Sequence, residues 1–138
     1  MVALRVAAVS LDCADPNELG VFYQQLLGGE MLWSSTGSVG IRAAGIVLVA
    51  QRVTPYTQPD WPDVSVVHLD LAATPDLQTA TADALRVGAI LVQPQIDPRW
   101  NVLLDPAGHP FCITTLTPPD EGPAAHSCRV ERSALMPR

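Results

Sequence analysis

The order of apolar and polar positions predicts a strand followed by a helix near the start of the chain. Residues 6–13 are rich in apolar and β-branched side chains, which predicts a strand. Asp15-Pro16-Asn17-Glu18 then supplies an acidic N-cap, a proline at the first helical position and a glutamate at the third. Apolar side chains at helical spacing extend this helix up to Gly28: Leu19, Phe22, Tyr23, Leu26 and Leu27.

The same pattern occurs twice along the chain. Short strands are predicted at 31–35, 39–43 and 46–53, and a second opening strand at 64–71. Thr74-Pro75-Asp76 repeats the cap-then-proline start of a helix, which an apolar stripe extends to 87, and further strands are predicted at 89–92, 100–104 and 110–116. Leu11-Asp12 matches Leu69-Asp70, and Gly28 matches Gly88, at offsets of 58 and 60 residues.

This repeat predicts an α+β fold in which two βαβββ modules form a curved, mostly antiparallel sheet around a cleft. The expected domain covers residues 3–118, with one module at 3–54, a linker at 55–63 and the other module at 64–117. The proline-rich segment 118–138 is predicted to be a mobile tail with at most one weak helical turn, at 130–135.

Composition limits the partners of the chain. Its 8 basic residues are all arginine and its 14 acidic residues give a net charge of −6, which disfavours nucleic acid as a partner. No apolar run approaches the ~20 residues of a membrane span, and the N-terminus lacks a signal-peptide pattern, so we expect a cytoplasmic protein. The 3 cysteines have no ligand-like spacing and predict neither a disulfide framework nor a zinc knuckle.

Strand alternation assigns polar side chains to one face of each opening strand. Leu11 and Leu69 should pack beneath the helices, since they belong to the apolar positions of their strands. The neighbouring positions then line the concave face of the predicted cleft: Ser10, Asp12, His68 and Asp70.

Four motifs occur here in an order that resembles the vicinal oxygen chelate superfamily of glyoxalases, bleomycin-resistance proteins and extradiol dioxygenases. They are Leu11 to Pro16, Gln51-Arg52-Val53, His68 to Leu71, and the closing LLDPAGHPFCIT segment. The resemblance, closest to small glyoxalase-like domains, covers about residues 3–118. It implies a small-molecule ligand and a possible homodimer.

The resemblance also implies four metal-ligand positions, one on the first and one on the fourth strand of each module. By register these are Ala8, Val49, Val66 and Cys112. Three are aliphatic and the fourth is a thiol where the family typically has a carboxylate, whereas a catalytic site needs about three donors. Sliding the register brings in Ser10 and His68 at best, so the sequence predicts no metal and no cofactor.

The residues expected to contact a ligand are Ser10, Asp12, Trp33, Gln51, His68, Asp70, Trp100 and Cys112. A structural role is the alternative for these residues. The aspartates would cap strand ends or loops, the tryptophans would pack in the core, and Cys112, which has no basic neighbour in sequence, would be a buried inert thiol. The leading hypothesis is metal-free binding of a small organic molecule, similar to bleomycin resistance. One alternative is an enzyme, either a glyoxalase-type lyase or isomerase or a dioxygenase-like protein, which would use His68 and an aspartate as acid and base or would use a divalent metal. The other alternative is a dimerising module with an empty cavity.

Overall fold

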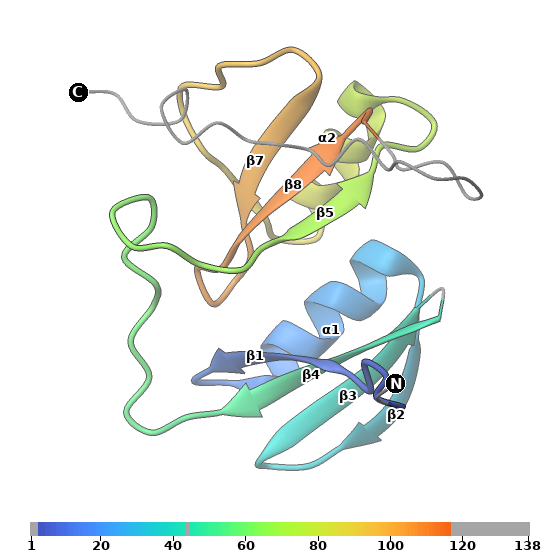
Figure 1. Cartoon of the computed structure of the whole chain (residues 1–138), viewed down its shortest axis with the longest axis vertical. Helices are drawn as coiled ribbons and strands as arrows, with labels where there is room; N and C mark the ends of the chain where they lie inside the picture. Colours follow the sequence, from blue (N-terminus) through green and yellow to red (C-terminus); the bar gives the residue numbers. More distant parts are fainter. Residues whose placement is uncertain (1–2, 44, 117–138) are drawn as a thin grey trace. The chain divides into compact units, whose positions relative to one another are not determined.

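A computed structural model of the chain describes residues 3–43 and 45–116. The chain divides into two compact units between Gln58 and Pro59 (Figure 1). In the described part, each unit contains one helix and a four-stranded sheet. The predicted tail at 118–138 lies outside the described residues.

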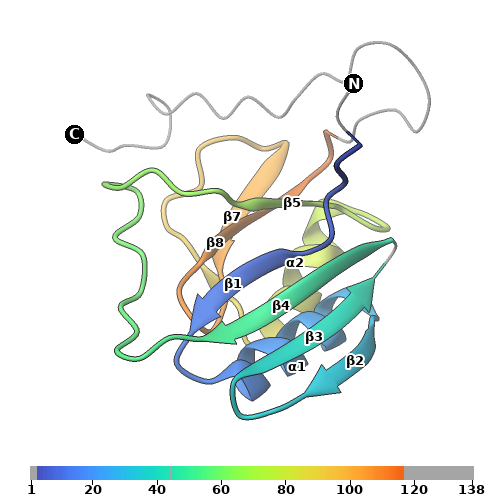
Figure 2. The same ribbon diagram turned by 60° about the horizontal axis from the view of Figure 1, so that its bottom comes forward.

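The first unit consists of β1 (Val9–Cys13), α1 (Pro16–Leu27), β2 (Glu30–Ser34), β3 (Ser38–Ala43) and β4 (Ile46–Arg52). Its strand order is β1-β4-β3-β2, with β1 parallel to β4 and the other two pairings antiparallel. The helix lies against one face of this sheet (Figure 2).

The second unit repeats this topology with β5 (Leu69–Ala72), α2 (Leu77–Arg86), β6 (Ile90–Leu91), β7 (Trp100–Leu104) and β8 (Pro110–Thr114). Its strand order is β5-β8-β7-β6, and β5 is parallel to β8 while the other pairings are antiparallel. The two βαβββ modules and the α+β class predicted from the repeat are therefore confirmed.

An aspartate caps the N-terminus of each helix. The first helix begins at Pro16, as the sequence predicts, whereas the second begins at Leu77 and not at Pro75, because Asp76 and not Thr74 is its cap. The Asp15 carboxylate accepts hydrogen bonds from the backbone N–H groups of Asn17 and Glu18 at 3.0 and 3.2 Å. The Asp76 carboxylate accepts one from the N–H of Thr79 at 2.7 Å. These caps fix where each helix leaves the opening strand of its module.

The apolar core of each module lies between its helix and its sheet. In the first module, Leu11 lies with buried side chains of α1, β3 and β4, among them Leu19, Val39 and Leu48. Gly20 is required there, because a Cβ atom would come within 2.4 Å of the Val39 side chain. Strand alternation then places Ser10 and Asp12 on the face away from α1, as predicted.

The opening strands are shorter than the apolar runs predicted them to be. The pairing of β5 with β8 runs only from Leu69↔Phe111 to Ala72↔Thr114, so residues 64–68 precede the strand. Similarly β1 begins at Val9, paired with Leu48, rather than at residue 6. A backbone segment becomes a strand only where a partner satisfies its hydrogen bonds, and an apolar pattern does not report that partner.

Candidate functional site

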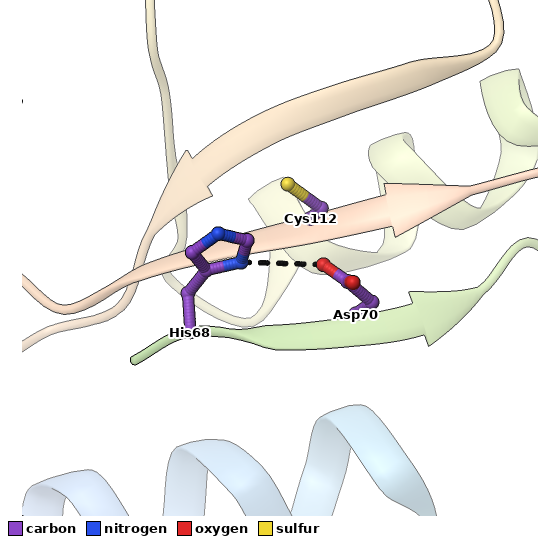
Figure 3. Close-up of side chains that lie close together, drawn as sticks. All are labelled: His68, Asp70 and Cys112. Atoms are coloured by element: carbon purple, nitrogen blue, oxygen red, sulfur yellow. Dashed lines mark ion pairs between the residues drawn. The ribbon is translucent and has the colours of Figure 1, made fainter. Parts of the chain in front are cut away.

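Three side chains of the second module meet at one point of its sheet. A nitrogen of His68, a carboxylate oxygen of Asp70 and the sulfur of Cys112 all lie within 4.8 Å of one another (Figure 3). We call this group the His-Asp-Cys cluster. Among the described residues it is the only group of three or more histidine, cysteine and acidic side chains placed to hold one metal ion.

The sheet register explains why these side chains meet. Asp70 on β5 and Cys112 on β8 are direct partners in the parallel pairing, so their side chains share one face. His68 precedes Asp70 by two residues and points to the same side (Figure 3). The opposite face packs on α2, where the Asn101 amide donates a hydrogen bond to the Thr81 hydroxyl at 3.0 Å.

The cluster combines a buried thiol with two partly exposed groups. The Cys112 residue is 2% exposed and packs with Trp100 and Val102. By contrast, the side chains of His68 and Asp70 are 29% and 36% exposed. Cys112 forms no disulfide. A solute can therefore approach the imidazole and the carboxylate, with the sulfur beneath them.

His68 and Asp70 form a close pair. The Nδ1 atom of His68 lies 3.2 Å from Oδ1 of Asp70, yet this buried nitrogen has no well-directed hydrogen bond within the described part of the chain. The contact is therefore an ion pair when the imidazole is protonated. This contact with Asp70 is the largest influence and raises the pKa of His68 above 6.5; burial opposes it, and the carboxylate charge adds to it.

The corresponding positions of the first module carry different groups. Ser10 is the partner of Val49, and Asp12 is the partner of Gln51, all on the face away from α1. Ser10, Asp12 and Gln51 are exposed and offer a hydroxyl, a carboxylate and an amide. These three groups share one face of the first sheet, but among the described residues they form no cluster of titratable groups like that of the second module.

The two tryptophans expected to contact a ligand occupy different environments. Trp33 is 42% exposed, and its indole Nε1 donates a hydrogen bond to the Ser38 hydroxyl at 2.9 Å. Its ring lies against Gly40, where a Cβ atom would come within 2.3 Å. Trp100 is 6% exposed and packs beside Cys112, with the Arg99 guanidinium 4.9 Å from its ring centroid.

The donor chemistry of the cluster fits a divalent ion. The family resemblance implies four ligand positions, of which Ala8, Val49 and Val66 offer no donor atom. Cys112 is the one position of the four with a side chain that can bind a metal ion. The structure adds His68 and Asp70, two donors outside those positions, together with the buried Nδ1 atom that lacks a directed hydrogen bond. Imidazole, carboxylate and thiolate are all ligands that transition metals accept.

Sequence reasoning missed the meeting of Cys112 with an imidazole, because 44 residues separate it from His68. The signal was nevertheless present. Pairing the two strands that open and close the second module in parallel would have placed Asp70 opposite Cys112. The thiol does have a basic neighbour, in space rather than in sequence.

The chain is a protein of two repeated βαβββ modules with polar side chains on one face of its sheets. The sequence profile of the family described as a glyoxalase-like domain matches residues 8–114. This chain belongs to that family, within the vicinal oxygen chelate superfamily. No curated protein matches its sequence.

Solved structures share this fold at low sequence identity. A glyoxalase-related enzyme from Fulvimarina pelagi is 18% identical with a TM-score of 0.65, over 86% of this chain and 95% of that one. The fosfomycin resistance protein FosX from Listeria monocytogenes, in a complex of a variant with Mn(II) and 1S,2S-dihydroxypropylphosphonic acid, is 16% identical with a TM-score of 0.64, over 85% and 93%. An Arabidopsis thaliana gene product is 20% identical with a TM-score of 0.63, over 82% and 99%. In the described part of this chain no helix is long and apolar enough to cross a membrane.

Proposed function

We propose that this protein binds a small organic molecule against the polar sheet face of its second module, and that binding needs no metal ion. The observation that carries the proposal is the His68–Asp70 pair, partly exposed on the face opposite α2. The imidazole offers a hydrogen-bond donor and an acceptor, and the carboxylate holds its orientation. Trp33 and the exposed polar groups Ser10, Asp12 and Gln51 are the further contacts we propose, together with the buried Trp100 and Cys112. A homodimer and a cytoplasmic location belong to the same proposal.

The proposal is supported by the family and by the chemistry of the pair. The FosX structure holds a small organic acid, so a similar fold accommodates a ligand of this size. A partly buried imidazole beside a carboxylate also costs less to desolvate than an isolated charge, because each group compensates the other. Polar ligands can therefore replace water here without leaving a buried charge unpaired.

A binding screen on the whole chain in excess chelator tests this proposal. The probes are 1S,2S-dihydroxypropylphosphonic acid and a library of small organic acids and amides, followed by ligand-observed NMR. We expect at least one probe to bind, and His68→Ala to weaken that binding about tenfold or more. Glu30→Ala, at an exposed position of the first module that is not a proposed contact, is the control and should leave the affinity unchanged. Absence of any bound probe, or equal affinity in both variants, would overturn the proposal.

The second candidate function is catalysis with His68 as acid or base and Asp70 as the group that orients it. The pairing at 3.2 Å favours this candidate, since a carboxylate beside an imidazole fixes its tautomer and stabilises its protonated form. Incubation of each bound probe with the protein, followed by product analysis, separates the two functions. Conversion that His68→Gln abolishes, while the probe still binds, identifies an enzyme; an unchanged probe identifies a binding protein.

A further inference from the structure

The Cys112 thiol lies beside a group that can take its proton. A nitrogen of the His68 imidazole is within 4.8 Å of the Cys112 sulfur, and the Asp70 carboxylate is 3.2 Å from Nδ1 of the same imidazole (Figure 3). A nucleophile, a base and a group that orients the base are the three parts of an activated nucleophilic site. The cluster of the second module contains one side chain for each part.

The other buried thiol in the described part of the chain has a different neighbour. Cys13 is 1% exposed and Cys112 is 2% exposed, so burial does not distinguish them. The Cys13 thiol donates to the backbone carbonyl oxygen of Gln51 at 3.5 Å. A carbonyl oxygen accepts a hydrogen bond but does not remove the proton, whereas a neutral imidazole can accept that proton. The two thiols should therefore differ in reactivity.

We propose that Cys112 is a nucleophile that forms a thioether with neutral α,β-unsaturated carbonyl compounds, with His68 as its base and Asp70 as the residue that positions the base. This inference goes beyond the proposed function, which is reversible binding, although both concern the same sheet face. It assigns to Cys112 a covalent role that ligand binding does not require.

The addition balances without a further reactant. As the sulfur bonds to the β carbon of the carbonyl compound, the thiol proton passes to His68 and the electron pair of the C=C bond moves toward the carbonyl oxygen, giving an enolate. The protonated imidazole, which the Asp70 carboxylate stabilises, then gives the proton to the α carbon. The product is a saturated carbonyl compound joined to Cys112 by a thioether, and His68 is again neutral.

The surroundings of the thiol favour a neutral electrophile. Cys112 packs with Trp100 and Val102, and Trp61 lies against the same apolar cluster, so the carbon skeleton of a ligand finds apolar contacts there. Asp70 lies on the accessible side and repels anions. Sulfur is also a soft and polarisable atom, which suits a conjugated carbon.

The electrophile reaches the sulfur past two side chains that can move. The side chains of His68 and Asp70 are 29% and 36% exposed, and Figure 3 shows them on the same side of the sheet as the Cys112 sulfur. Exposed side chains change rotamer within picoseconds to nanoseconds, so rotation of either one opens a path without unfolding the module. The same rotation shortens the separation between the imidazole and the sulfur.

Alkylation of the full-length chain by N-ethylmaleimide, in excess chelator, tests the inference. The chain carries Cys128→Ser, so that cleavage after arginine leaves Cys112 as the single thiol of its peptide. Mass spectrometry of the two peptides then gives the rates at Cys112 and Cys13. We expect Cys112 to react at least about tenfold faster, because an imidazole lies beside it. N-ethylsuccinimide, which lacks the C=C bond, should leave both peptides unchanged.

Equal rates at the two thiols would overturn the inference, since they would mean that both react only when the fold opens. This comparison needs no substitution within the cluster. In addition, His68→Gln should slow the reaction of Cys112 at least about tenfold and leave that of Cys13 unchanged. An unchanged rate at Cys112 in this variant would also overturn the inference. A faster reaction of Cys13 would report an opened fold, and the comparison of the two thiols with His68 in place then decides.

A change of probe charge tests the role of Asp70. Maleimidopropionate has the same reactive ring as N-ethylmaleimide but carries a carboxylate. With each rate divided by the rate for free cysteine, maleimidopropionate should react with Cys112 about fivefold more slowly or less. Asp70→Asn should remove this discrimination, and it should slow N-ethylmaleimide less than Asp70→Ala does, because the amide oxygen still accepts a hydrogen bond. Discrimination that persists in Asp70→Asn would overturn the role given to Asp70.

The result is distinguishable from that of the binding screen. The screen measures reversible binding, whereas alkylation is measured as a covalent mass change at Cys112. A bound probe in the screen without preferred alkylation of Cys112 would leave the proposed function standing and overturn the nucleophile. Preferred alkylation that depends on His68, without any reversible ligand, would support the nucleophile and overturn the proposed function.

Discussion

The two modules share a topology but differ in the chemistry of their exposed sheet faces. At matching places, the first module has Ser10, Asp12 and Gln51, while the second has His68, Asp70 and Cys112. Only the aspartate is common to both. The repeated βαβββ unit therefore supplies two sheet faces of the same topology, and they differ in two of the three matching side chains.

The most demanding test of this comparison transfers the second module's groups to the first. Asp12 and Gln51 are register partners as Asp70 and Cys112 are, and Ser10 precedes Asp12 by two residues. The double substitution Ser10→His and Gln51→Cys should therefore give the first module the groups of the second. An organic probe that the second module binds should then bind at two equivalents in place of one, as measured by calorimetry in excess chelator. Gln51→Cys alone is the control and should remain at one equivalent.

The next largest effect concerns the core that positions the cluster. Phe111 is fully buried on β8, beside Cys112 in sequence. Phe111→Ala should lower the free energy of unfolding by about 3–5 kcal/mol, because it removes apolar contacts and leaves a cavity. Urea denaturation followed by circular dichroism measures this change. Loss of less than about 1 kcal/mol would show that the second module has little core at β8.

A smaller effect separates two glycines of the first module. In Gly40→Ala the new methyl group would lie 2.3 Å from the Trp33 ring, so the indole must move and its hydrogen bond to Ser38 is strained. We expect a loss of about 1–3 kcal/mol and a change in tryptophan fluorescence. Gly37→Ala is the control, since no heavy atom lies within 4 Å of its added carbon. Equal effects of the two substitutions would mean that the ring does not rest on Gly40.

The smallest effect is a pH dependence confined to the second module. Because the pKa of His68 is raised above 6.5, the His68–Asp70 pair stabilises the fold fully below pH 6.5. That contribution is lost as the pH rises through the pKa of the folded state. An NMR titration of metal-free protein should show His68 titrating above 6.5, and Asp70→Asn should lower its pKa. Asp12→Asn, in the first module, should leave it unchanged.

Much of the fold follows from local sequence patterns. The Asp15 cap and the apolar spacing of α1 are local signals, so the order of the elements and their repeat were predicted correctly, although the cap of α2 is Asp76 and not Thr74. Alternation also placed Leu11 and Ser10 on opposite faces. The ends of β1 and β5 were not predicted, because they depend on which residues of β4 and β8 lie opposite.

The candidate site was predicted only in part, for the same reason. His68 and Asp70 were expected on one face, since they are two residues apart in the strand predicted at 64–71. Their meeting with Cys112 depends on the register between β5 and β8, which no local pattern contains. The proximity of the His68 imidazole to the Cys112 thiol was therefore not predicted, because the two residues are far apart in sequence. The positions implied by the family resemblance were mostly aliphatic residues.

The two-residue length of β6 has a consequence for the behaviour of the protein at high concentration. This strand ends the second sheet at Ile90–Leu91, and Ile90 is 62% exposed. An exposed edge strand can pair with a strand of another chain through its unpaired amide and carbonyl groups, and a two-residue strand offers few of these groups. The second sheet thereby resists fibrous self-association on that side despite its exposed isoleucine.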